Sequence, residues 1–288
     1  MTTLALPHTN PPQPLLIEPI VRRALDEDLG IAGDITTDHI VPAGGMKRAV
    51  LVARKAGTVA GLIAADLAFR LVDPACRMTA NTPDGAQVAA KGMIAEIEGP
   101  ARAILTGERV ALNFLCHLSG VATATRALVD AVAGTKARIT CTRKTTPGLR
   151  LLEKYAVRCG GGVNHRFGLF DAILIKENHI AAVGGVAQAV KAARERLGHL
   201  VKIEVEVENL KQLETALALG VHAVLLDNMA PEIMKRAVAL TNGRAVLEAS
   251  GGVTRETVRA IAETGVDYIS SGTITHSAPV LDIGLDFV

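Results

Sequence analysis

Five basic side chains follow apolar runs or a glycine-rich stretch in the second half of the chain. They are Arg143, Lys144, His165, Arg166 and Lys176. Basic residues usually lie on the solvated surface, but Arg143, Lys144 and Lys176 directly follow runs whose composition predicts strands buried on both faces. Arginine offers two parallel donors to a carboxylate or a phosphate. The cluster therefore predicts a pocket for a small anion that carries more than one such group.

Two acidic side chains, Glu206 and Asp227, also stand at the ends of apolar runs. Ion pairing with the nearby lysines would explain them. Mg²⁺ would explain them as well, because proteins usually hold this ion with one or two carboxylates together with substrate oxygens and water. A third role is to stabilise a positively charged sugar in a dissociative transition state. All three roles place the two carboxylates beside the anion pocket.

Two glycine motifs, Ser250-Gly251-Gly252 and Ser271-Gly272-Thr273, end the last two apolar runs. Either motif alone is typical of an ordinary turn or a helix N-cap. As an adjacent pair they favour a phosphate site, because small residues let backbone N–H groups approach an anion. We expect Ser250, Gly251 and Gly272 to hold this phosphate, with His276 as a further contact.

The remaining histidines and the four cysteines argue against other kinds of site. The sequence has no HxH, HExxH or Cys/His cluster for zinc, and no GxSxG motif for a serine nucleophile. The cysteines are widely spaced and form no CxxC pair. This spacing, with no secretory signal, favours a reduced compartment, and we expect a cytoplasmic protein.

The composition of the 288 residues bounds the function further. Hydrophobic residues make up 49%, aromatic residues 2%, and the formal net charge is +2. A sizeable core is therefore expected, whereas a basic footprint or stacking platform for nucleic acid is not. Apolar stretches are interrupted by charge or glycine before they reach the length of a membrane span, so we expect a soluble protein without a membrane partner.

Short β-branched runs alternate with helical stretches from about Lys136 onward. Strands are predicted at 138–142, 172–175, 201–207, 223–226, 245–248 and 267–270. Such alternation indicates βαβ units and a parallel sheet, either a β/α barrel or an open doubly wound sheet. Every one of these runs ends at a charged or glycine-rich motif. A barrel gathers all its strand ends around one pocket, whereas an open sheet gathers only those at its switch point, so a barrel is favoured.

The first half of the chain predicts a mixed α/β domain. Helices are expected at 15–29 and 101–118, and strands at 48–52, 58–63 and 93–97. The prolines of the first residues disfavour a helix there. We therefore expect a loose tail over 1–14, an α/β sandwich domain over 15–118 to which the C-terminal tail 276–288 could return, and a barrel domain over 119–275.

The motifs of this sequence resemble those of the quinolinate phosphoribosyltransferase family, which is also called nicotinate-nucleotide pyrophosphorylase (carboxylating). The resemblance covers nearly the whole chain outside the N-terminal tail. Its motifs include DEDLGIAGDITT (26–37), GERVALNFLCHLSGVAT (107–123), TRKTTPGLR (142–150), EKYAVRCGGGVNHRFGLFDAILIKENH (153–179), EVEVE (204–208), VLLDNM (224–229), EASGGV (248–253) and SSGTITHSAPVLDIGLD (270–286).

The resemblance implies an N-terminal α/β sandwich, an incomplete α/β barrel of parallel strands, and a homodimer with shared active sites. It implies phosphoribosyl transfer from phosphoribosyl pyrophosphate to quinolinate with decarboxylation, a step of de novo NAD biosynthesis. The five basic residues would grip the two carboxylates of quinolinate, and Lys144 would also act in catalysis. Glu206 and Asp227 would lie beside the ribose and Mg²⁺, and Arg109 would enter the partner subunit's site.

Two alternatives remain. A paralogue of the family could act on nicotinate or another ring, but several arginines in one pocket favour a dianion. A non-catalytic phosphate-ligand binding protein could share the barrel, but it would not need Lys144, Glu206 and Asp227.

Overall fold

The computed structural model describes residues 10–288, which fall into two compact units. The first unit comprises the chain up to Arg126 together with 145–161 and 273–288, and the second comprises 127–144 and 162–272. Residues 1–9 of the predicted tail lie outside the described residues. Helix α1 begins at Pro14, the last residue assigned to that tail, because proline is well suited to the first position of a helix.

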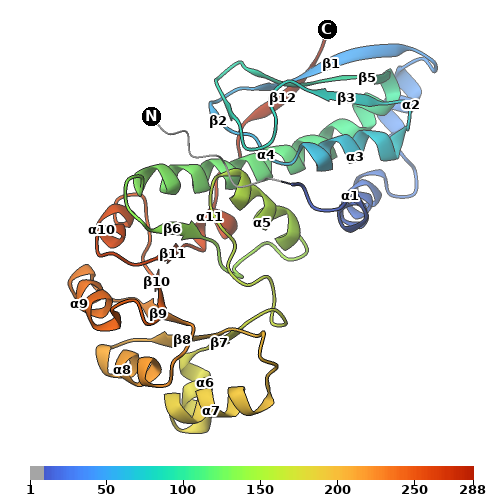
Figure 1. Cartoon of the computed structure of the whole chain (residues 1–288). Helices are drawn as coiled ribbons and strands as arrows, with labels where there is room; N and C mark the ends of the chain where they lie inside the picture. The colour runs from blue at the N-terminus through green and yellow to red at the C-terminus, as the bar shows by residue number, and fades with distance from the viewer. Residues whose placement is uncertain (1–9) are drawn as a thin grey trace. The chain divides into compact units, whose positions relative to one another are not determined.

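The first unit is built on an antiparallel sheet with strand order β12-β1-β5-β3 (Figure 1). The strands are β1 (Met46–Ala53), β3 (Arg77–Ala80), β5 (Met93–Pro100) and β12 (Ile283–Phe287), and a separate pair is formed by β2 (Gly57–Thr58) and β4 (Gln87–Val88). The helices are α1 (Pro14–Leu29), α2 (Ile35–Ile40), α3 (Leu62–Val72), α4 (Ala101–Ala131, which from Ala127 on belongs to the second unit), α5 (Arg150–Cys159) and α11 (Thr273–His276). The last strand, β12, pairs with β1 from Ala49↔Phe287 to Ala53↔Ile283.

One predicted element of this unit is wrong. The apolar run 58–63 was expected to be a strand, but strand β2 ends at Thr58 and helix α3 starts at Leu62. Gly61 lies between them with φ of +106°, where glycine is favoured. From there Ala64, Ala65 and Ala68 are fully buried at helical spacing. Helix α4, predicted to end at Leu118, continues to Ala131.

The second unit contains the six predicted strands in one parallel sheet of order β6-β11-β10-β9-β8-β7. They are β6 (Arg138–Thr140), β7 (Ile173–Ile175), β8 (Ile203–Val207), β9 (Ala223–Asp227), β10 (Val246–Ser250) and β11 (Tyr268–Ser270). The helices are α6 (Glu177–Val183), α7 (Val186–Arg196), α8 (Leu210–Ala218), α9 (Pro231–Thr241) and α10 (Val258–Ala262). Strands β6 and β7 are the two edges of this sheet, so the six strands do not close into a full barrel.

The two faces of this parallel sheet differ in polarity. In β8, Ile203, Val205 and Val207 are at most 2% exposed, whereas Glu204 and Glu206 point to the opposite face. Helices α8, α9 and α10 lie along one side of the strands (Figure 1). The same alternation recurs in β10, which places Glu248 and Ser250 on the face that carries Glu204 and Glu206. No helix among residues 10–288 is long and apolar enough to cross a membrane.

Candidate active site

The register of the parallel strands brings polar residues together at one edge of the second unit. Ser250 at the end of β10 is paired with Asp227 at the end of β9 and with Ser270 at the end of β11. Ser270 is in turn paired with Thr140 of β6. The carboxyl ends of these strands therefore form one continuous row, which is where α/β proteins bind ligands.

A parallel bridge between Thr140 and Val163 extends this row beyond β6. The segment after Val163 therefore runs past the end of β6, the strand that Arg143 follows in the sequence. The pKa of Arg166 is lowered mainly by burial and next by the positive charge of Arg143. The structure thus holds two guanidinium groups close together in a partly desolvated place. Their repulsion would be relieved by a bound anion.

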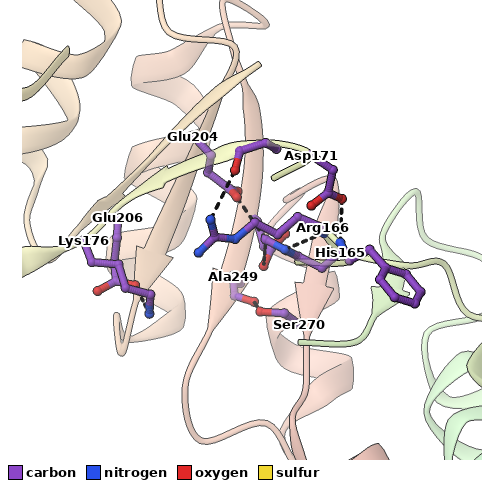
Figure 2. A network of polar contacts seen from close by, with 11 residues as sticks. His165, Arg166, Asp171, Lys176, Glu204, Glu206, Ala249 and Ser270 are labelled. Atoms are coloured by element: carbon purple, nitrogen blue, oxygen red, sulfur yellow. Dashed lines mark hydrogen bonds and ion pairs between the residues drawn. The ribbon is translucent and has the colours of Figure 1, made fainter. Parts of the chain in front are cut away.

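The loop that carries Arg166 is fixed by short polar contacts. Asp171 accepts the backbone N–H of Phe167 at 2.6 Å and that of Gly168 at 2.9 Å. The Arg166 guanidinium donates through Nη1 to the Ala172 carbonyl at 3.1 Å, and the Arg166 amide donates to Nδ1 of His165 at 2.8 Å (Figure 2). Asp171 was not predicted as a site residue. The signal for it was its position in the FGLFDA segment just before a predicted strand.

Lys176 and Glu206 form an ion pair at the same edge. Lys176 Nζ lies 3.1 Å from Glu206 Oε2, and the two side chains are 50% and 14% exposed (Figure 2). Pairing with lysine, one of the roles considered for Glu206, is therefore present. The backbone N–H of Lys176 donates to Nδ1 of His179 at 2.9 Å, which fixes the start of α6. Because Lys176 is half exposed, its ammonium group can move to a ligand at little cost.

Asp227 lies in a tight turn that depends on glycine. Its Oδ2 accepts the Asn228 side-chain amide at 2.8 Å, and the Asn228 backbone N–H donates to the Ser250 carbonyl at 2.9 Å. Gly251 has φ of +96°, and a Cβ at this position would collide with the Asn228 side chain. Any larger residue at 251 would therefore displace the turn that orients Asp227.

A histidine and two glutamates meet on the same face of the sheet. His165 Nε2 lies 3.0 Å from Glu204 Oε2 and 3.7 Å from Glu248 Oε1. Glu248 is 5% exposed, and its Oε1 is buried without a hydrogen bond. Burial first, and the negative charge of Glu204 second, raise the pKa of Glu248 to about 7. Sequence reasoning gave neither Glu204 nor Glu248 a role in the site.

The other predicted site residues fall in different places. Lys144 is exposed, and its backbone N–H donates to Thr142 Oγ1 at 2.9 Å. Ser271, before Gly272, donates its N–H to the Thr140 carbonyl at 3.0 Å. Arg109 and His276 belong to the first unit, and both are exposed. The second unit by itself therefore assembles the predicted site apart from these two residues.

Two family models together match nearly all of the described chain. The N-terminal domain of quinolinate phosphoribosyl transferase matches residues 34–119, and its C-terminal domain matches residues 121–286. The chain belongs to the quinolinate phosphoribosyltransferase family. The family, the α/β fold class and the enzyme class predicted from the sequence motifs are thereby confirmed.

Relatives and a solved structure match this chain along nearly its whole length. A nicotinate-nucleotide pyrophosphorylase (carboxylating) of Mycobacterium leprae is 47% identical over 92% of this chain and 95% of its own. A quinolinate phosphoribosyltransferase (decarboxylating) of Nicotiana tabacum is 40% identical over 92% of this chain and 81% of its own. The solved nicotinate-nucleotide pyrophosphorylase of Francisella tularensis superposes with a TM-score of 0.93 at 40% identity, over 99% of this chain and 100% of that one.

Proposed function

We propose that this chain transfers the phosphoribosyl group of phosphoribosyl pyrophosphate to quinolinate and releases pyrophosphate and CO₂, which yields nicotinate mononucleotide. The observation that carries the proposal is the pair of crowded guanidinium groups, Arg143 and Arg166, at the carboxyl edge of the parallel strands. Such a pair favours a ligand with two carboxylates over one with a single carboxylate. Quinolinate is a dianion, and nicotinate is a monoanion.

In this proposal the arginines and Lys176 bind the two carboxylates of the pyridine ring. Each arginine can form two parallel hydrogen bonds to one carboxylate, which fixes the plane of the ring. The ion pair of Lys176 with Glu206 opens when the ring carboxylate replaces Glu206 as the partner of the ammonium group. This exchange leaves Glu206 available to the other substrate.

The second substrate is held along the row of strand ends. Ser250, Gly251 and Gly272 provide small side chains and backbone N–H groups to the 5′-phosphate, and a contact from His276 stays a prediction of the family resemblance. Lys144, which is exposed at the end of β6, neutralises the departing pyrophosphate. Catalysis of this kind depends on positioning and electrostatic stabilisation.

Glu206 and Asp227 fit a Mg²⁺ ion. Glu206 lies near the end of β8 and Asp227 ends the neighbouring strand β9, and both offer the hard oxygen ligands that Mg²⁺ prefers. When bound, Mg²⁺ supplies positive charge to the pyrophosphate oxygens. The same two carboxylates stabilise the positive charge that develops on the ribose as the bond to pyrophosphate breaks.

The bond changes follow from these placements. The pyridine nitrogen forms a bond to the ribosyl carbon as that carbon loses pyrophosphate. The ring nitrogen is then quaternary and positively charged. When the adjacent carboxylate departs as CO₂, its bonding electrons stay on the ring carbon beside the positive nitrogen, which stabilises them, and a proton from solvent then binds that carbon. The quaternised ring therefore needs no further cofactor for this step.

The assembly and location remain part of the proposal. We infer a homodimer in which Arg109 of each chain completes the site of its partner, with a higher assembly also compatible, and a cytoplasmic location. The exposure of Arg109 on α4 supports the first inference.

One assay tests the function. The chain is incubated with Mg²⁺, phosphoribosyl pyrophosphate and either quinolinate or nicotinate, and the mononucleotide and CO₂ are measured. We expect kcat/KM for quinolinate to exceed that for nicotinate by orders of magnitude, because nicotinate offers one carboxylate where quinolinate offers two to the guanidinium groups. Equal use of nicotinate would reject the assignment in favour of a paralogue. Binding of both substrates without turnover would indicate a non-catalytic binding protein.

A further inference from the structure

Both ring nitrogens of His165 are engaged by neighbouring groups. Nδ1 lies 2.8 Å from the backbone nitrogen of Arg166, and Nε2 lies 3.0 Å from Glu204 Oε2. A backbone N–H can only donate, so Nδ1 must present a lone pair. Nε2 therefore carries the one ring proton and donates it to Glu204. This pattern is that of a neutral imidazole.

We propose that His165 is a neutral positioning residue, which holds the backbone of Arg166 through Nδ1 and is anchored through Nε2–H on Glu204. Arg166, and not His165, then presents positive charge to the substrate. This inference rests on the proposed function only in taking that substrate to be the pyridine dicarboxylate. The hydrogen-bond pattern itself stands without it.

The carboxyl groups beside the ring do not make it a cation. Glu204 and Glu248 both face Nε2, at 3.0 and 3.7 Å. A second ring proton would sit on Nδ1 and point at the Arg166 N–H across 2.8 Å, which would oppose two donors. Glu248, whose buried Oε1 has no hydrogen bond, is the cheaper place for an additional proton. The raised pKa of Glu248 agrees with that placement.

The same argument opposes a metal ion at this cluster. The ligand atoms of His165, Glu204 and Glu248 lie within 4.8 Å of one another. An ion bound to Nε2 would force the ring proton onto Nδ1, again against the Arg166 amide. A metal could bind only after that hydrogen bond was broken. Metal binding is therefore an outcome that contradicts the proposal.

For the site, the consequence is that His165 helps to position Arg166. Arg166 is held at its backbone by His165 and at its guanidinium by the Ala172 carbonyl at 3.1 Å. Removing the His165 acceptor frees one of these two ends. We therefore expect the loss to appear in recognition of the ring carboxylate, with little effect on the sugar side of the reaction.

The tautomer is tested by nitrogen NMR on the full chain with ¹⁵N-labelled histidine and no ligand. The His165 signals are assigned by their absence in His165→Gln. At neutral pH we expect one protonated nitrogen, Nε2, and one unprotonated nitrogen, Nδ1. An imidazolium, or a proton on Nδ1, would overturn the proposal. A shift of these signals when Zn²⁺ is added would do the same.

Kinetics test the link to Arg166. His165→Leu should raise KM for quinolinate about tenfold, the worth of one hydrogen bond, and leave kcat and KM for phosphoribosyl pyrophosphate nearly unchanged. His165→Asn keeps an uncharged acceptor where Nδ1 lies and should recover most of the loss. If Asn is as poor as Leu, the ring acts by its charge and the proposal fails.

A matched control is His222→Asn. Its Nδ1 also accepts a backbone N–H, that of Ile203 at 3.2 Å, but it precedes β9 at the opposite end of the strands. This variant should leave both KM values unchanged. If the wild-type chain turns over no quinolinate at all, the proposed function fails while the NMR result still decides the tautomer.

Discussion

At the scale of single residues, the site is a set of charges held near one another before any ligand binds. Burial, and after it the positive charge of Arg143, lower the pKa of Arg166, and Lys176 is paired with Glu206 at 3.1 Å. The repulsion between the two arginines costs free energy. The ion pair keeps the Lys176 ammonium group beside the ligand site. Both are typical of binding sites rather than of surfaces selected only for stability.

Replacing Arg143 by alanine should weaken recognition of quinolinate strongly. The ring carboxylate would remain desolvated without its two-pronged donor, and we expect a loss of about 2–5 kcal/mol in binding. The crowding of Arg166 would be relieved at the same time, so the thermal midpoint should not fall. Isothermal calorimetry measures the binding, and Arg196→Ala on α7 is the control. Normal quinolinate affinity in Arg143→Ala would show that this arginine has another role.

Replacing Asp227 by asparagine should act on the sugar side. The substitution keeps the size of the side chain and removes a negative charge, so kcat should drop by about two orders of magnitude. Affinity for quinolinate should change little, because the ring lies with the arginines. The effect on turnover is measured as kcat across a Mg²⁺ titration, and the affinity for quinolinate is measured by calorimetry. Wild-type kcat at every Mg²⁺ concentration would contradict the role.

At the scale of elements, the strand ends follow closely from the sequence. The six runs between residues 138 and 270 were predicted from β-branched residues that stop at charged or glycine motifs, and all six are strands. The run 58–63 had the same composition and is divided between a strand and a helix. Periodicity over so few residues cannot separate the two structures, and only the burial of α3 decides.

The contact between His165, Glu204 and Glu248 could not be predicted in the same way. Glu204 and Glu248 belong to β8 and β10, which are separated by β9. Whether their side chains meet depends on the stagger of three strands and on the curvature of the sheet. The sequence specified only the face on which each lies, through the alternation along each strand. The tautomer of His165 likewise depends on a loop conformation that composition does not reveal.

This contact between strands makes stability depend on pH. Because the pKa of Glu248 is raised to about 7, the folded chain keeps a proton that the unfolded chain releases near its ordinary pKa. The free energy of unfolding contributed by this group is thus full below pH 4.5 and is lost as the pH rises through 7. The shift corresponds to a loss on the order of 3 kcal/mol.

Glu248→Gln should remove most of that loss, because glutamine stays uncharged. Thermal midpoints at pH 5 and pH 8 are compared for wild type and variant, with the exposed Glu208→Gln as the control. The difference between the thermal midpoints at pH 5 and pH 8 should become smaller for Glu248→Gln and should not change for Glu208→Gln. An unchanged difference for Glu248→Gln would show that Glu248 is ionised throughout this range.

At the scale of the whole molecule, the site proposed here requires two copies of the chain. Arg109 lies on α4 in the first unit, and sequence reasoning without the family would have treated it as a surface residue. Its proposed role can be separated from a role in its own chain by complementation. Arg109→Ala and Arg143→Ala are each expected to be nearly inactive when expressed alone.

Co-expression of these two variants should restore activity to roughly a quarter of the wild-type value. Random mixing makes half of the dimers mixed, and one of the two sites in each mixed dimer combines an intact Arg143 with an intact Arg109 from the other chain. Native mass spectrometry verifies the mixed dimers. If Arg109 serves its own chain, every site in a mixed dimer carries one defect, and no activity returns.

The pairing of β12 with β1 also determines when the chain can finish folding during its synthesis. The ribosome makes β1, β3 and β5 early, but the strand that covers the open edge of β1 consists of residues 283–287. That edge stays unpaired while the entire parallel unit is translated, and an unpaired edge is prone to association with other nascent chains. The first sheet can therefore be completed only after the entire parallel unit has been synthesised.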